Sequence, residues 1–218
     1  MPDGLNNGQP EPSVSCHRII EATERSMKFS PSLFAGLALA SSALLAGAPA
    51  FAQQKLVPEQ SEITFVSKQM GVPVEGRFKK FDAQVAFDPA KLATSKVTIT
   101  VDTGSATLGV KESDAELPKA TWFNVPRFPQ ATFQSTAIKS TGPGKFEVAG
   151  KLSIKGATQD VVAPVTLTQN GATTIATGSF PIKRLAFKIG ENEWADTSMV
   201  ADEVQVKFKL ALTGVGKL

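Results

Sequence analysis

The chain has 218 residues, a formal net charge of +3, one cysteine, one histidine and no tyrosine. Because the cysteine and histidine are the neighbours Cys16 and His17, the rest of the chain lacks both residue types. The other 216 positions cannot supply Ser-His-Asp or Cys-His catalysis, a histidine or cysteine metal site, or a disulfide. Basic residues are scattered rather than clustered, which argues against nucleic acid as a partner.

Residues 27–52 have the features of a signal peptide. Lys28 follows Met27, residues 33–45 form an apolar run, and Ala50-Phe51-Ala52 fits the small-residue requirement of a signal peptidase. The run is too short to span a bilayer, which needs roughly 20 apolar residues, and a buried core helix is the alternative reading. We predict cleavage after Ala52 and a periplasmic product.

Residues 1–26 precede this signal and are polar, with no hydrophobic periodicity. They are interpreted as an extension upstream of the true start at Met27, or as a disordered leader removed with the signal. In either case the Cys16-His17 pair is not a site in the exported protein. Residues 1–52 hold three of the 23 basic and four of the 20 acidic residues, so residues 53–218 carry a net charge of +4.

Residues 53–218 are predicted to form one domain, and its hydrophobic pattern has period two almost throughout. Short loops rich in glycine, proline and asparagine separate the alternating runs, which predicts antiparallel pairing. One segment, residues 111–124, breaks the alternation and is predicted to form a short helical insertion after the third strand. The eight predicted strands lie near residues 63–68, 74–87, 97–101, 131–137, 146–154, 161–167, 173–189 and 204–212.

Eight antiparallel strands can form a sandwich or an up-and-down β-barrel. Two features favour the barrel. The second and seventh strands are long and contain Gly76, Gly178 and Pro181, where a strand could bend, and the inward face is rich in phenylalanine. An eight-stranded barrel is wide enough to hold its own side chains or one elongated apolar ligand. The expected fold class is therefore all-β, an eight-stranded antiparallel up-and-down barrel.

Four stretches of the chain, in this order, resemble the YceI-like family: "SEITFVSKQMGVPVEGRFKKFDAQVAFDP", "FNVPRFPQATFQSTAIKS", "FEVAGKLSIKGATQDVVAPVTL" and "FPIKRLAFKIGENEWADTSMVADEVQVKFKL". The resemblance covers about residues 58–213. It implies an exported, lipocalin-like barrel that binds a long isoprenoid or other lipid chain in an internal cavity. Without this resemblance, the alternating pattern alone would favour an ordinary packed core for the same phenylalanines.

The candidate ligand-binding residues follow from this resemblance and from the inward face. Trp122 and Phe123 could either plug the barrel end or form the lip of a cavity. Arg184 could be a solvated surface arginine or an anion contact at the barrel mouth. The complete predicted set is Phe65, Phe78, Phe87, Ile99, Leu117, Trp122, Phe123, Phe133, Phe146, Val148, Phe180 and Arg184.

The function predicted from these observations is non-catalytic binding of a polyisoprenoid, a quinone tail or a related lipid, with no cofactor or metal. Transient membrane contact and a homodimer are compatible with it. Two alternatives remain: a barrel with a filled core that binds a partner, and an enzyme acting on a lipid or glycan. The acids considered for such an enzyme are Asp114, Glu116, Glu191 and Glu193, and those in residues 190–196 are read as loop acids in solvent.

Overall fold

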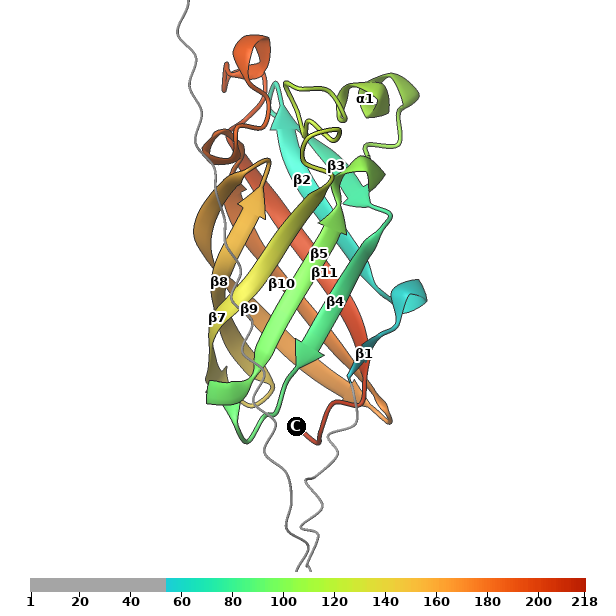
Figure 1. Cartoon of the computed structure of the whole chain (residues 1–218), viewed down its shortest axis with the longest axis vertical. Coiled ribbons are helices and arrows are strands. Elements are labelled where there is room, and N and C mark those ends of the chain that lie inside the picture. The colour runs from blue at the N-terminus through green and yellow to red at the C-terminus, as the bar shows by residue number, and fades with distance from the viewer. Residues whose placement is uncertain (1–53) are drawn as a thin grey trace, which may run out of the picture. The chain divides into compact units, whose positions relative to one another are not determined.

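The computed structural model describes residues 54–218, and these form an antiparallel β-structure with little helix (Figure 1). The predicted leader (1–26) and signal peptide (27–52) lie outside the described residues. The single α-helix of the described part is α1 (Lys111–Glu116), and there are five 3₁₀ turns: η1 (Pro58–Gln60), η2 (Leu92–Thr94), η3 (Thr103–Ser105), η4 (Arg184–Phe187) and η5 (Asn192–Trp194).

The strands lie where the alternating pattern predicts them. Because period-two runs put every second side chain on one face, each long strand has one face toward the interior. The bounds are β1 (Lys55–Leu56), β2 (Glu62–Gln69), β3 (Val72–Phe78), β4 (Phe81–Ala86), β5 (Lys96–Asp102), β6 (Ala106–Thr107), β7 (Gln130–Gly142), β8 (Lys145–Ile154), β9 (Ala157–Asn170), β10 (Thr173–Lys183) and β11 (Glu203–Thr213).

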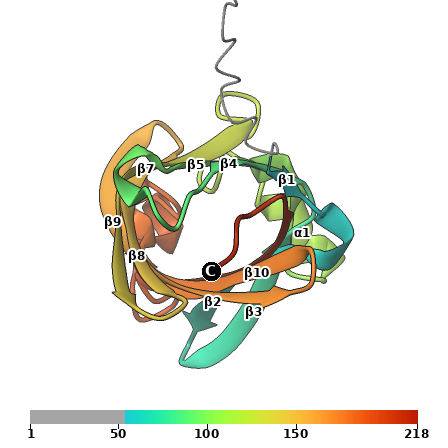
Figure 2. The same cartoon turned by 90° about the horizontal axis from the view of Figure 1, so that it is seen from below.

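These strands form one antiparallel sheet in the order β4-β5-β7-β8-β9-β10-β11-β2-β3-β6, with β1 paired to β11. The two ends of this order are joined by the chain itself. Arg77 and Phe78 of β3 pair with Thr107 and Ala106 of β6 in antiparallel fashion. β4, which follows β3, pairs in the same antiparallel fashion with β5, which precedes β6. β3 and β4 therefore act as one long bent strand, and the sheet curls around an interior (Figure 2). The predicted barrel class is confirmed. The eleven strands amount to eight when β1 with β2, β3 with β4, and β5 with β6 are each taken as one interrupted strand.

The seventh predicted strand, residues 173–189, is longer than the observed strand β10. It was expected to continue to residue 189, but β10 ends at Lys183 and the chain turns through η4. Apolar residues still alternate in the sequence at Leu185, Phe187 and Ile189, which explains why the segment reads as strand, although Leu185 is only half-buried. The bond from Arg184 N–H to the Asp202 carbonyl is the last in register with β11, and the backbone then turns as Lys188 N–H bonds to the Leu185 carbonyl and Ile189 N–H to the Arg184 carbonyl.

Three glycines allow phenylalanine rings to lie flat on a neighbouring strand. A Cβ on any of them would overlap a ring, and at Gly150 and Gly178 it would also overlap a backbone carbonyl oxygen of the neighbouring strand. Gly76 and Gly178 are also the glycines at which the sequence analysis allowed a strand to bend, and the register with one neighbouring strand continues through both of them. Their observed contribution is close packing with an aromatic ring. The pairs are Gly76 with Phe65, Gly150 with Phe133, and Gly178 with Phe208.

The two ends of the barrel differ. At one end, α1 with the following turns, and the loop 184–202, cover the interior (Figure 1). At the other end the C-terminal residues lie across the opening (Figure 2), where Gln169 Nε2 donates to the carbonyls of Val215 and Gly216. Within residues 54–218 no helix is long and apolar enough to cross a membrane.

Candidate functional site

The barrel interior contains two adjoining cavities. The inner cavity has a volume of about 170 Å³ and extends toward the C-terminal end, where Val215 lines it. The cap cavity has a volume of about 240 Å³ and lies beneath α1 and the loop 184–202. Six residues line both cavities, so the two spaces meet in mid-barrel: Ile63, Val101, Ala131, Leu152, Phe180 and Val206.

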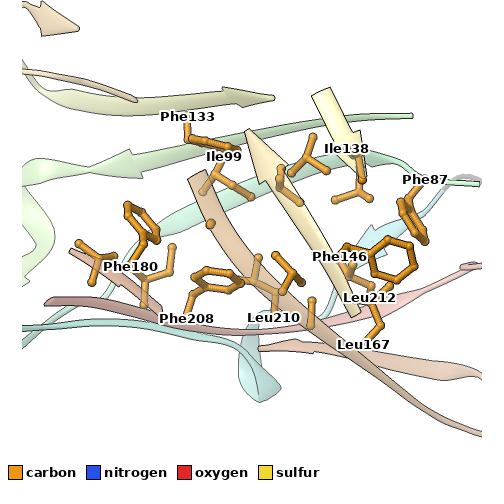
Figure 3. Close-up of a pocket in the computed structure, with 18 of the residues that line it drawn as sticks. Phe87, Ile99, Phe133, Ile138, Phe146, Leu167, Phe180, Phe208, Leu210 and Leu212 are labelled. Atoms are coloured by element: carbon orange, nitrogen blue, oxygen red, sulfur yellow. The ribbon is translucent and has the colours of Figure 1, made fainter. Parts of the chain in front are cut away.

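The inner cavity is almost entirely apolar. Apart from Thr132 and Thr174, every residue that lines it has a hydrocarbon side chain. Figure 3 shows these side chains converging from strands on opposite sides, with Phe133 and Ile99 across from Phe180 and Phe208. An apolar cavity of roughly 150 Å³ in another protein stays dry and binds small apolar molecules. The inner cavity is therefore suited to hydrocarbon rather than to water.

All of the predicted binding residues line one of the two cavities. This placement agrees with the cavity reading of the phenylalanine-rich face, although ligand contact itself stays a prediction. Phe180 lines both cavities. Phe87, Ile99, Phe133, Phe146 and Val148 line the inner cavity, and Phe65, Phe78, Leu117, Trp122, Phe123 and Arg184 line the cap cavity.

The sequence-based prediction missed the contribution of β11 and of the loop that precedes it. Phe208, Leu210 and Leu212 alternate along β11 and project into the inner cavity (Figure 3). The signal was present, because these residues share one face of a period-two run. Trp194 in η5 also lines the cap cavity. It lies in a loop without periodicity, so no pattern indicated it.

The sequence left two roles open for Trp122 and Phe123, a plug of the barrel end or the lip of a cavity, and the two residues differ in this respect. Phe123 is 8 % exposed, belongs to the main core cluster, and packs edge-on against Phe78 with ring centroids 5.9 Å apart. Trp122 is half-buried and packs against Trp194, with centroids 5.6 Å apart. Phe123 is therefore part of the packed core. Trp122 instead connects the segment that follows α1 with the loop 184–202 at the rim of the cap cavity, and these two are the segments that cover this end of the barrel.

Arg184 is neither a surface arginine nor a free anion contact. Its side chain is 2 % exposed, which contradicts the solvated alternative. Arginine has five N–H donors, and all five bond to backbone carbonyls of the same loop. Nε donates to Ala201 at 3.1 Å, Nη1 to Ile189 and Gly190 at 2.9 and 2.8 Å, and Nη2 to Trp194 and Val200 at 2.7 Å each.

This network gives Arg184 a structural role. Burial lowers its pKa from the ordinary value, and the Asp202 carboxylate partly opposes that effect. Because every donor already has an acceptor, none is available to a ligand head group in this geometry. The sequence-based hypothesis of an anion contact therefore needs another residue. The sequence could not indicate this role, because the five acceptors are backbone carbonyls and every residue type has one.

Lys155 makes a second buried contact with the same loop. Its ammonium is nearly covered and donates to the Lys188 carbonyl at 2.5 Å and to the Glu191 carboxylate at 2.9 Å. Lys155 has a positive φ at the turn between β8 and β9. Arg184 and Lys155 thus fix the loop 184–202 from two sides.

Of the four acids considered for catalysis, Asp114, Glu116 and Glu191 are engaged in separate contacts. Glu191 bonds to Lys155, Glu116 bonds to Lys119 at 2.6 Å, and Asp114 accepts from Thr107 Oγ1 and from Leu108 N–H. The Thr107 hydrogen bond is the main cause that lowers the pKa of Asp114. In the described part of the chain, no three His, Cys, Asp or Glu residues gather as metal ligands would.

The geometry defines a class: an antiparallel barrel with two adjoining, mainly apolar cavities, covered at one end by aromatic side chains. The family model described as "YceI-like domain" matches residues 54–212, and this chain belongs to that family. This confirms the resemblance drawn from the sequence.

Similar proteins support the same assignment. The chain is 37 % identical to a UPF0312 protein of Azotobacter vinelandii over 59 % of this chain and 68 % of that protein. It shares 50 % identity with Burkholderia cenocepacia BcnA, whose crystal structure it matches with a TM-score of 0.70 over 72 % of this chain and 99 % of that one. A Saccharophagus degradans domain described as polyisoprenoid-binding has the same fold at 13 % identity, with a TM-score of 0.61 over 74 % and 98 % of the two chains.

Proposed function

We propose that this protein binds one long apolar chain, such as a polyisoprenoid, a quinone tail or another lipid, inside the barrel. The observation that carries the proposal is the pair of adjoining cavities with a shared apolar wall. An extended chain fits this geometry because it can pass from the cap cavity into the inner cavity without meeting an unpaired charge. The description of the Saccharophagus degradans relative as polyisoprenoid-binding supports the choice of ligand class.

The energetics favour a hydrocarbon ligand. Each buried CH₂ contributes about 0.8 kcal/mol. A ligand with about ten enclosed carbons therefore gains several kcal/mol before any polar contact, which offsets the cost of ordering the chain. A filled core would leave no such space, so the two cavities favour the carrier over the filled-core alternative.

Binding rather than catalysis is the proposal because nearly all side chains that line the cavities lack acid-base chemistry, and the two exceptions, Glu116 and Arg184, are paired within the protein. The acids that line or surround the cap cavity are engaged separately, as described above. General acid-base catalysis needs a group within hydrogen-bonding reach of the reacting atom. Incubation of the protein with extracted lipids, followed by mass spectrometry for altered products, tests the enzyme alternative.

We further propose that the protein works in the periplasm. The signal peptide predicted over residues 27–52 supports export, and an internal cavity suits the movement of an insoluble chain through water. The expected N-terminus of exported protein is Gln53. Edman sequencing or intact mass decides this point, and an exported chain that retains residues upstream of Met27 would contradict it.

The central experiment is mass spectrometry of organic extracts from the purified exported protein. Ala131→Phe places a ring at the wall shared by both cavities and should reduce retention of a long chain severalfold. Val162→Phe is the matched control, because Val162 is 56 % exposed on β9 and a ring there leaves the interior unchanged. The proposal fails if neither the wild type nor the control retains any apolar chain, including after incubation with extracted lipids.

A further inference from the structure

The polarity of the two cavities is asymmetric. The cap cavity is lined by Ser67, Gln69 and Ser113 in addition to its aromatic and aliphatic residues. None of these three side chains forms a hydrogen bond with another described residue. The inner cavity exposes only apolar atoms although Thr132 and Thr174 belong to its lining, and the Thr174 hydroxyl already accepts from Gln169 Nε2. A chain with one polar end would therefore place that end in the cap cavity.

The Trp122 indole supplies a specific donor at this polar end. Its Nε1 is shielded from solvent and, within residues 54–218, is the one buried side-chain nitrogen or oxygen without a hydrogen-bond partner. Native proteins rarely leave a buried donor unpaired, so each exception calls for a partner. A ligand oxygen in the cap cavity would provide the missing acceptor.

The indole is also held in position without a ligand. Trp122 packs on Trp194, and its backbone N–H bonds to the Lys119 carbonyl at 3.0 Å. The neighbouring Thr121 carbonyl accepts from Gly190 and Glu191 of the loop 184–202. The donor is therefore fixed between both covering segments, which reduces the ordering cost when an acceptor binds.

The charges around the cap cavity oppose an anionic head group. Arg184 is the one cation among its described lining residues, and all five of its donors are taken by carbonyls. Glu116 also lines this cavity and carries a negative charge paired with exposed Lys119. A phosphate would lose its hydration, gain no free cation and approach a carboxylate, which is strongly unfavourable.

We propose that the cap cavity is a head-group site for an uncharged, oxygen-bearing end of the bound chain, with the Trp122 N–H as its hydrogen-bond donor. The chemical class is an alcohol, phenol or quinone carbonyl, and the tail extends into the inner cavity. This inference rests on the proposed binding function and adds a ligand orientation and a preference against phosphate.

Three probes with the same fifteen-carbon isoprenoid skeleton test it: farnesol, farnesyl phosphate and the hydrocarbon farnesene. Equilibrium dialysis against delipidated exported protein gives an affinity for each. Wild type should bind farnesol more tightly than farnesyl phosphate. Trp122→Phe should weaken farnesol binding about three- to tenfold, the range of one neutral hydrogen bond, and change farnesene binding less than twofold.

Trp194→Phe is the matched control, since it makes the same indole-to-phenyl change in the partner ring. It should alter farnesol and farnesene binding equally. It also leaves Trp122 as the single tryptophan, whose emission should shift to longer wavelength with farnesol and not with farnesene. This second measurement does not depend on the folding of Trp122→Phe.

Several results would overturn the inference. They are a wild-type preference for farnesyl phosphate, an equal effect of Trp122→Phe on farnesol and farnesene, and a selective loss of farnesol binding in Trp194→Phe. No difference between the farnesol and farnesene emission shifts would also overturn it. If wild type binds none of the three probes, the proposed function fails and the head-group site fails with it, so the two failures are distinguishable.

Discussion

The backbone of Gly190 lies directly against the guanidinium of Arg184, and its carbonyl accepts a hydrogen bond from Nη1 at 2.8 Å. A Cβ at residue 190 would overlap Nη1, and the φ angle there is +71°. The same residue donates its N–H to the Thr121 carbonyl of the other covering segment. One glycine thus joins the buried arginine, the loop 184–202 and the segment that carries Trp122.

Gly190→Ala should therefore destabilise the protein by about 2–4 kcal/mol. Roughly 1–2 kcal/mol comes from a side chain in the left-handed region, and the remainder comes from displacement of the guanidinium from its acceptors. Urea unfolding of the exported protein measures the change. Gly109→Ala is the control, because its φ is +78° but no atom lies within 4 Å of the added Cβ. Equal losses in both variants would mean that the contact with Arg184 carries no weight.

Arg184→Gln should act on the fold and leave ligand charge preference unchanged. The substitution removes most of five hydrogen bonds and leaves buried carbonyls unpaired, with an expected loss of about 3–5 kcal/mol in unfolding free energy. Lys183→Gln is the control, because Lys183 is exposed and its contact with Glu203 is 3.6 Å, a pair worth at most about 1 kcal/mol. A selective loss of phosphorylated ligands with normal stability would restore Arg184 as an anion contact.

The fold could be predicted from the sequence because alternation is a direct consequence of strand geometry. Residues such as Phe133 and Phe146 identify the interior face wherever the pattern is regular. The role of Arg184 could not be predicted, since its five acceptors are backbone atoms of a folded loop. The same holds for Gly178, whose place beneath the Phe208 ring depends on cross-strand register rather than on local sequence.

Gly178→Val should reduce the space available to a ligand. The added side chain would overlap both the Pro164 carbonyl oxygen of β9 and the Phe208 ring, which lines the inner cavity. Retention of a long chain should fall severalfold in mass spectrometry of extracts, and the unfolding free energy should fall by about 3 kcal/mol, at the upper end for overpacking, because the β9 backbone must shift as well as the ring. Gly142→Val is the control, because nothing lies within 4 Å of its Cβ position and its φ is not positive. Unchanged lipid retention in a destabilised Gly178→Val protein would show that this ring does not limit the cavity.

The last prediction concerns how a chain reaches the cap cavity from a membrane. Met70 and Val72 at the β2–β3 turn are 71 % and 62 % exposed, and Met199 of the loop 184–202 is 46 % exposed. Met70 N–H bonds to the Met199 carbonyl, so these apolar side chains belong to adjoining segments beside Gln69 and Val200, which line the cap cavity. Exposed apolar side chains at a cavity rim suit brief contact with a lipid surface.

The double variant Met70→Asp/Met199→Asp should slow transfer of a fluorescent isoprenoid from phosphatidylcholine vesicles to the protein severalfold, while the affinity for farnesol in solution stays within twofold. The reason is that a carboxylate resists leaving water at the bilayer surface, whereas the cavity itself is unchanged. Val162→Asp is the control, because Val162 is 56 % exposed on the barrel wall in β9. Transfer rates that are equal in the double variant and in wild type would exclude this rim as the membrane contact. A similar slowing in Val162→Asp would mean that the effect of an added charge is not specific to this rim.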